Sequence, residues 1–168
     1  MPNVESLNQH NKNYISDDAF EKEKRAHLEH NSDNFKFLYQ DDIPHGDALD
    51  KHKLSYAVDI GSGTGWFANY LVEQRKYKKV YAIEPSEEAI EIAKKIYPDS
   101  NKVKYINGFA EEEISKLKLS KPTFFSTMCC LAHLEDEDVL GILKTIDKIA
   151  PVDSVLACSE PWGDFYHR

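Results

Sequence analysis

Five short runs rich in β-branched and aromatic residues alternate with helical runs in the part of the chain that begins at Ser55. The runs are "SYAVDI", "KVYAIE", "KVKYIN", "TFFSTMC" and "SVLACS". They recur about every 20 to 30 residues between turn residues, which is the spacing of strand–helix–strand units in a parallel sheet. The sequence therefore predicts an α/β fold in which helices flank a doubly wound, mainly parallel sheet.

Helical periodicity fills the intervals between these runs. Residues 66–74, 86–96 and 136–149 carry apolar side chains at helical spacing. Ser86 and Asp136 are residue types that favour the N-cap position, and acidic residues follow both of them in the first turn. We therefore expect helix N-caps at these two residues.

The first part of the chain is polar and poor in core residues. Asp18 followed by Glu21 resembles a capping box, which predicts a helix over residues 18–38. Because so few apolar residues cannot form a core alone, we expect an N-terminal helical segment, 1–53, that packs on an α/β domain, 54–168.

Composition and charge narrow the class of protein. The chain has 168 residues, 41% of them hydrophobic, which suits one core rather than two. It has no apolar run of about 18 residues and no secretory signal at its start, so we expect a cytoplasmic protein with no membrane partner. The formal net charge of −8 works against a broad phosphate-binding surface, so no nucleic acid partner is expected.

Neither the cysteines nor the histidines predict a metal site. Cys129, Cys130 and Cys158 lack paired C-x-x-C spacing and are too few for a disulfide framework, so we expect buried thiols in strands. His27 and His30 stand one helical turn apart with no further ligand at a defined spacing, which favours an exposed polar face.

Three glycines on alternate positions follow the first predicted strand, in "VDIGSGTG". This turn lies at the carboxyl edge of a doubly wound sheet, where ligands bind, and glycine lets the backbone approach a ligand closely. A P-loop is excluded because no Lys follows the glycines in the required spacing. A dinucleotide fingerprint fits poorly because Trp66 stands where its last glycine belongs.

The stretch "VDIGSGTG" resembles the first motif of the class I, Rossmann-like S-adenosylmethionine-dependent methyltransferases, an acid followed by G-x-G-x-G. The resemblance covers about residues 55–159 and implies that the cofactor is S-adenosyl-L-methionine. It implies that Asp59 lies near the methionine end of the cofactor and that the loop runs beneath the methionine and ribose. The cofactor contacts implied at this motif are Asp59, Gly61, Ser62, Gly63, Gly65 and Trp66.

Glu84 ends the second predicted strand, in "YAIEPSEEAI". A ribose presents two hydroxyl donors, and a strand-end carboxylate has enough acceptor sites for both. In the resemblance Glu84 binds the ribose, while Pro85 and Ser86 begin the next helix beside the adenine.

The stretch after the third predicted strand, "YINGFAEEE", departs from the family pattern. The family often has a Gly-Asp-Ala-Glu-like stretch here, whose acid meets the adenine amino group. Phe109 takes the place of that acid, between Gly108 and Ala110. We expect Phe109 to stack on or close over the adenine, and Asn107 or a backbone group to meet the amine.

The fourth predicted strand ends in "STMCCLAHLED", which resembles the family segment that runs under the sulfonium. The resemblance implies a floor formed by Met128, Cys129 and Cys130, with plain core packing as the alternative for the two thiols. His133 is the candidate catalytic residue, a general base for an acceptor hydroxyl. A cap of the strand-to-helix turn is its alternative role.

The family sheet continues beyond its fifth strand, whereas this sequence has nine residues after Ser159. We expect either a fragment that lacks the C-terminal part of the fold or a short form whose fifth strand pairs with a second copy. The resemblance implies a methyltransferase that acts on an oxygen or nitrogen of a small-molecule acceptor, such as a sugar or an amine. The alternative is a non-catalytic cofactor-binding or partner-binding subunit of the same fold.

Overall fold

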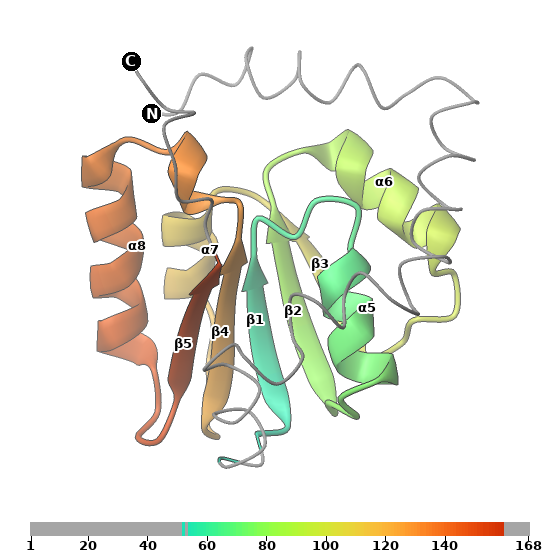
Figure 1. Ribbon diagram of the computed structural model, residues 1–168, viewed down its shortest axis with the longest axis horizontal. Helices are drawn as coiled ribbons and strands as arrows, with labels where there is room; N and C mark the ends of the chain where they lie inside the picture. The colour runs from blue at the N-terminus through green and yellow to red at the C-terminus, as the bar shows by residue number, and fades with distance from the viewer. Residues whose placement is uncertain (1–51, 53, 160–168) are drawn as a thin grey trace.

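Five strands form one sheet in the computed structural model, which describes residue 52 and residues 54–159 (Figure 1). Their order is β3-β2-β1-β4-β5, and all four neighbouring pairs are parallel. The predicted doubly wound parallel sheet is thereby confirmed. The strands are β1 (Tyr56–Ile60), β2 (Lys79–Glu84), β3 (Val103–Asn107), β4 (Thr123–Met128) and β5 (Val155–Ser159).

The helix expected over residues 18–38 lies outside the described residues, as does the tail 160–168. The division of the chain between residues 53 and 54 therefore stays a prediction.

A helix follows each of the first four strands. Within residues 54–159 these are α5 (Trp66–Glu73), α6 (Glu87–Ile96), α7 (Ala110–Ser115) and α8 (Asp136–Ile149), with a 3-10 turn η1 (Leu131–His133) between β4 and α8. The sequence did not predict α7, because a helix of six residues with one buried apolar side chain, Ile114, is too short to show a period.

One predicted N-cap is confirmed and the other is wrong. Ser86 caps α6, and its hydroxyl accepts a hydrogen bond from the Ala89 N–H at 3.2 Å. Asp136 is not a cap, because it already has helical backbone geometry as the first residue of α8. Glu135, whose backbone is extended, takes the cap position without a side-chain hydrogen bond. Asp136 instead lies in the first turn, where a negative charge suits the helix dipole.

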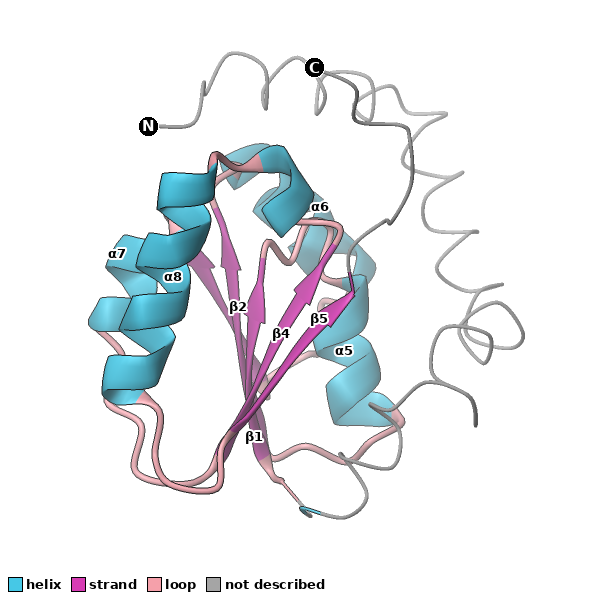
Figure 2. Ribbon diagram, turned by 60° about the vertical axis from the view of Figure 1, so that its left-hand side comes forward, coloured by secondary structure: helices cyan, strands magenta, loops and turns pink. Residues whose placement is uncertain are grey.

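Figure 2 shows that α5 lies on one face of the sheet and that α7 and α8 lie on the other. The strand order explains this arrangement. The chain moves outward from β1 through β2 to β3 and then returns past β1 to β4. Because crossovers between parallel strands are right-handed, this reversal places the helices before and after it on opposite faces. The switch point lies between β1 and β4, and ligands of such sheets bind at the carboxyl ends of the strands there.

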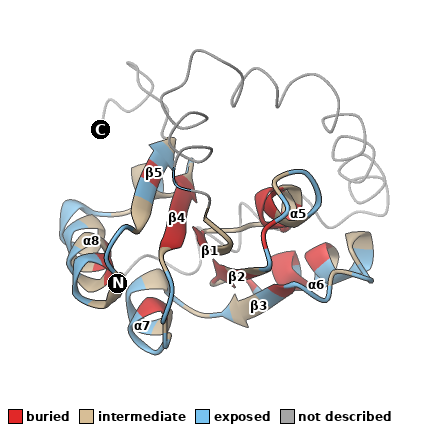
Figure 3. Cartoon of the chain, turned by 90° about the horizontal axis from the view of Figure 1, so that it is seen from below, coloured by how far each residue is buried: buried red, intermediate tan, exposed pale blue. Residues whose placement is uncertain are grey.

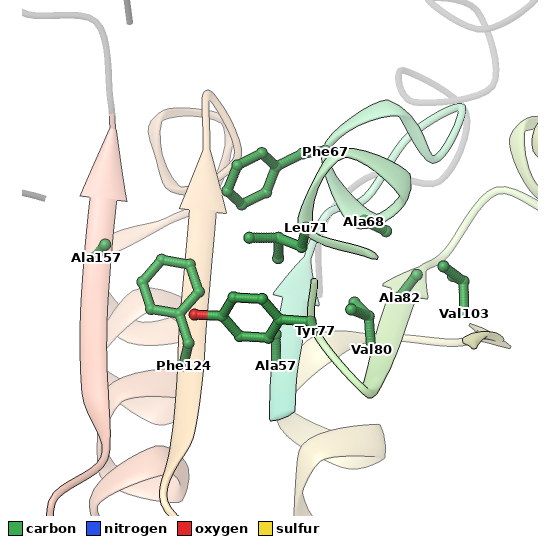
Figure 4. Packing of buried hydrophobic residues seen from close by; sticks show 10 residues of the cluster. All are labelled: Ala57, Phe67, Ala68, Leu71, Tyr77, Val80, Ala82, Val103, Phe124 and Ala157. Carbon is green, nitrogen blue, oxygen red and sulfur yellow. The ribbon is translucent and has the colours of Figure 1, made fainter. Parts of the chain in front are cut away.

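Two clusters of buried hydrophobic side chains hold the helices to the sheet. On the α5 face the rings of Phe67 and Phe124 meet edge to face, with centroids 6.5 Å apart (Figure 4). On the other face Ile114 of α7 and Ile142 of α8 pack against β1 and β4. Each such buried side chain contributes about 1.5–3 kcal/mol to stability. Central strands β1 and β4 are buried on both faces, whereas β3 and β5 carry exposed residues (Figure 3).

Strand β5 is an edge of the sheet formed by the described residues. Leu156 on this strand and Leu140 on α8 are exposed large hydrophobic side chains. No helix in the described part of the chain is long and apolar enough to cross a membrane.

Candidate functional site

The carboxyl edge of the sheet brings the predicted site residues together. Because all five strands are parallel, the segments that follow β1, β2, β3 and β4 emerge at this one edge. Each predicted contact lies in or beside one of these segments. They are Asp59, Gly61, Ser62, Gly63, Gly65 and Trp66 at the end of β1; Glu84, Pro85 and Ser86 at the end of β2; Gly108, Phe109 and Ala110 after β3; and Met128, Cys129 and His133 after β4.

The glycine loop, residues 61–65, is tied to the end of β2. The backbone N–H groups of Gly61 and Ser62 both donate to the Ile83 carbonyl oxygen, at 2.9 and 3.0 Å. The N–H of Gly63 donates to Glu84 Oε2 at 2.9 Å. These three bonds hold the loop between β1 and β2, so its backbone lies beside the carboxylate that was predicted to bind a ribose.

The surroundings of Gly61 and Gly63 differ. A Cβ on Gly61, where φ is 69°, would lie 2.8 Å from the Cβ of Cys130 and closer still to its sulfur. Gly61 is therefore required by packing against the end of β4. A Cβ on Gly63 would meet no atom of the described residues within 4 Å. The space above Gly63 is open, and it is the part of the loop that a ligand can approach.

Glu84 carries a buried carboxylate with acceptor capacity left. Its Oε1 accepts from the Ser86 N–H at 2.9 Å and its Oε2 from the Gly63 N–H. Burial raises the pKa of Glu84 above its ordinary value, and the two backbone bonds offset part of that shift. Each carboxylate oxygen has a further lone pair, so the group can accept two more hydrogen bonds from a diol.

Asp59 carries a second buried carboxylate, on β1 beside the switch point. Its Oδ1 accepts from the Ser126 hydroxyl at 2.9 Å, whereas its Oδ2 is buried with no hydrogen-bond partner among the described residues. Burial, and to a smaller extent the charge of Glu84, raises the pKa of Asp59 to about 7. An ionised carboxylate with one oxygen unpaired is stabilised by a cation, so Asp59 suits a positively charged ligand.

Sequence reasoning missed Ser126, although strand pairing could have found it. Ser126 is opposite Asp59 in the parallel register of β1 and β4. A buried serine one strand away from a buried acid is the partner that the acid needs.

The segment after β3 borders the Glu84 site. The N–H of Gly108 donates to the Glu84 carbonyl oxygen at 3.2 Å. Phe109 is 36% exposed, so its ring is available for contact with a ligand. The side-chain amide of Asn107 donates to the carbonyl oxygens of Glu84 and Pro85, at 3.2 and 3.0 Å. The side-chain nitrogen of Asn107 thus holds the turn after β2. An adenine amine donates hydrogen bonds, so Asn107 would meet it through Oδ1, and the expected contact through Asn107 or a backbone group stays a prediction.

The expectation that the three cysteines are buried thiols in strands is wrong. Cys129 and Cys158 are exposed and Cys130 is half-buried. Strand β4 ends at Met128, and Cys129, with φ 51°, turns the chain away from the sheet. As a result Cys130, more than Cys129, lies against the glycine loop.

His133 ends η1 and is exposed, three residues beyond Cys130. The structure places it on the carboxyl side of the sheet, after β4, where its backbone N–H donates to the Cys130 carbonyl oxygen at 3.2 Å. Within the described part of the chain no group of three or more His, Cys, Asp or Glu side chains is placed to hold a metal.

Residues 57–150 match the family model described as "Methyltransferase domain". The match covers more than half of the chain. The chain belongs to this methyltransferase domain family. This match and the sheet topology confirm the predicted class I, Rossmann-like methyltransferase fold, for which S-adenosyl-L-methionine is the methyl donor. No curated protein matches the sequence significantly.

Solved structures share the fold at low sequence identity. A S-adenosylmethionine-dependent methyltransferase from Clostridium acetobutylicum is 16% identical with a TM-score of 0.56, and the match covers 82% of this chain and 56% of that one. The plantazolicin methyltransferase BpumL, solved with a pentazolic desmethylPZN analogue and S-adenosylhomocysteine, is 17% identical with a TM-score of 0.56, and the match covers 86% of this chain and 54% of that one. Haemonchus contortus phosphoethanolamine N-methyltransferase 1, solved with phosphoethanolamine and S-adenosylhomocysteine, is 15% identical with a TM-score of 0.54. The match covers 89% of this chain and 34% of that one. This methyltransferase domain thus spans little more than half, or less, of these chains.

The residues at the carboxyl edge fit a methionine-linked nucleoside. Open space above Gly63 admits the ligand, and the Glu84 carboxylate has acceptor sites for a ribose diol. A cationic ligand near Asp59 would favour its ionised form, which burial otherwise disfavours. All of these features are observed in the described residues of this chain.

Proposed function

We propose that this chain binds S-adenosyl-L-methionine at the carboxyl ends of β1 and β2 and transfers its methyl group to an oxygen or nitrogen of a small-molecule acceptor. One observation carries the proposal: the Glu84 carboxylate is bonded to the N–H of Gly63, the loop residue with open space above it. A diol-accepting group and a backbone that a ligand can approach are thus held side by side.

The protein's contribution is binding and orientation. Glu84 accepts the two ribose hydroxyls, and the loop at Gly63 lets the ligand lie against the backbone. When bound, the cofactor supplies an electrophilic methyl group on a sulfonium. Holding an acceptor in line with that methyl contributes on the order of 7–11 kcal/mol to lowering the barrier. The remaining predicted contacts stay part of the proposal: Ser62, Gly65, Trp66, Pro85, Ser86, Gly108, Phe109, Ala110, Met128 and Cys129.

An acceptor that ionises with difficulty needs a base as well. We assign that role to His133, whose exposed side chain follows the segment that contacts Gly61. An imidazole that acts as a general base takes a proton from a hydroxyl or an ammonium acceptor. A neutral amine needs no base, and with such an acceptor His133 is not required.

The net charge of −8 supports a small molecule over nucleic acid as the acceptor. Self-association through the β5 edge and a cytoplasmic location stay predictions. The edge position of β5 and the exposed Leu156 support the first of these two.

Calorimetric titration of the 168-residue chain with S-adenosylhomocysteine, with NAD as the control ligand, tests the cofactor. Micromolar binding of the first ligand and none of the second supports the proposal. Absence of binding to S-adenosylhomocysteine contradicts it. A panel of amines and alcohols, assayed for release of S-adenosylhomocysteine, then separates an enzyme from the alternative of a non-catalytic subunit, which binds without turnover.

A further inference from the structure

A buried amide lies behind the glycine loop. Asn69, on α5, is 1% exposed. Its Nδ2 donates to the Gly65 carbonyl oxygen at 2.6 Å and to the Tyr105 hydroxyl oxygen at 2.8 Å. Its Oδ1 accepts from the Ser100 hydroxyl at 2.5 Å. Both N–H groups and one acceptor site of the amide are therefore used, so its orientation is fixed.

The Gly65 carbonyl is the point at which this cluster meets the loop. It also accepts the backbone N–H of Asn69 at 3.1 Å, while the N–H of Gly65 donates to the Ser62 carbonyl oxygen at 2.9 Å. Tyr105 packs so closely that a Cβ on Gly65 would lie 2.9 Å from Tyr105 Cε1. The last residue of the loop is thus held by α5 and by β3 together.

A glycine loop needs such support from behind. Glycine loses more conformational freedom on ordering than any other residue, so a loop with three glycines is costly to fix when a ligand binds. The front of this loop is open at Gly63. Ordering the loop before the ligand arrives lowers the cost of binding.

We propose that Asn69, together with Tyr105, is a positioning residue that holds the Gly65 carbonyl and so presets the glycine loop for its ligand. The inference rests on the proposed function for the identity of that ligand. Burial raises the pKa of Tyr105 to about 12, so its hydroxyl stays neutral and available to Asn69 at any pH used in an assay. Ser100 fixes the opposite side of the amide, from the loop between α6 and β3.

Two substitutions and a matched control test this role in the full chain. Asn69→Leu removes the polar atoms at nearly constant size, and Tyr105→Phe removes one hydroxyl oxygen. Thr123→Val is the control, because Thr123 is 1% exposed and its hydroxyl donates to Lys121 at the opposite edge of the sheet. Residue-resolved hydrogen exchange of the ligand-free proteins reports the order of residues 61–65, and titration with S-adenosylhomocysteine reports affinity.

We expect Asn69→Leu to speed exchange of the loop amides about tenfold relative to Thr123→Val and to weaken binding by a similar factor. Tyr105→Phe should act in the same direction by less, and the double variant should match Asn69→Leu alone. Loop exchange equal to that of Thr123→Val overturns the proposal, and so does unchanged affinity in variants of a wild type that binds. If the wild type does not bind, the proposed function fails, and the exchange data still decide the role of Asn69.

Discussion

Glu84 Oε2 accepts a hydrogen bond from the Gly63 N–H at 2.9 Å, which joins the end of β2 to the open centre of the glycine loop. Two residues 21 positions apart thereby lie side by side at the carboxyl edge of the sheet. The carboxylate orients the loop and remains able to accept donors from a ligand.

Glu84→Gln should weaken binding of S-adenosylhomocysteine by roughly 2 kcal/mol, about thirtyfold, because a charged acceptor for the ribose is lost. The fold should also lose about 1–3 kcal/mol of stability, because a glutamine has one acceptor oxygen and leaves the N–H of Gly63 or of Ser86 without its acceptor. Titration calorimetry and thermal unfolding measure the two effects. Glu88→Gln, an exposed change on α6, is the control. Equal affinities of the two variants would remove Glu84 from the site.

Alanine at Gly63 should act mainly on binding, whereas alanine at Gly61 should act mainly on stability. Gly63→Ala places a methyl group in open space, so we expect a loss of about 1 kcal/mol of stability from the left-handed backbone and more than tenfold weaker binding. Gly61→Ala drives a methyl group into Cys130, so a further loss of about 1–3 kcal/mol is expected. Urea unfolding and titration distinguish them. Native affinity in Gly63→Ala would show that no ligand approaches there.

The sequence allowed the sheet, and the position of the candidate site residues at its carboxyl edge, to be predicted because both depend on local signals. A run of a few β-branched or aromatic residues is enough to indicate a strand. The carboxyl ends of parallel strands lie at the same edge of the sheet, whichever side chains the strands carry. Asn69 could not be predicted in this way. A polar residue on the core face of a helix shows only that a partner exists, and its partners Tyr105 and Ser100 are 36 and 31 positions away. Short α7 and the turn at Cys129 likewise depend on tertiary packing.

Stability should fall as the pH rises from about 4 to about 7. Burial raises the pKa of Asp59 from 3.8 to about 7, so in this range the folded state keeps a proton that the unfolded state releases. Each rise in pH then favours the unfolded state, and above about 7 the contribution of Asp59 becomes constant. Urea unfolding at a series of pH values measures the slope.

Asp59→Asn should flatten that slope, because an amide does not titrate and can still accept from Ser126. Some slope should remain, since the pKa of Glu84 is also raised. Asp99→Asn, an exposed change, is the control. A slope in Asp59→Asn as steep as in the wild type would show that Asp59 does not hold a proton in the folded state.

Alkylation of Cys130 should weaken cofactor binding. Its thiol lies against Gly61, so an added carboxamidomethyl group must displace the loop. We expect a chain whose single cysteine is Cys130 to lose about tenfold in affinity after complete reaction with iodoacetamide. A chain that keeps only Cys158, which is exposed on β5, is the control and should bind as before. Mass spectrometry gives the extent of reaction, and full affinity after complete modification of Cys130 contradicts the prediction.

His133→Asn should separate binding from chemistry. The side chain is exposed in η1, so the fold and the affinity for S-adenosylhomocysteine should be unchanged. With a hydroxyl acceptor, release of S-adenosylhomocysteine should fall by about a hundredfold or more, as expected when a general base is removed. His52→Asn, an exposed histidine before β1, is the control. If His133→Asn methylates every hydroxyl acceptor of the wild type at the wild-type rate, His133 is not the general base. Its role is then limited to the strand-to-helix turn.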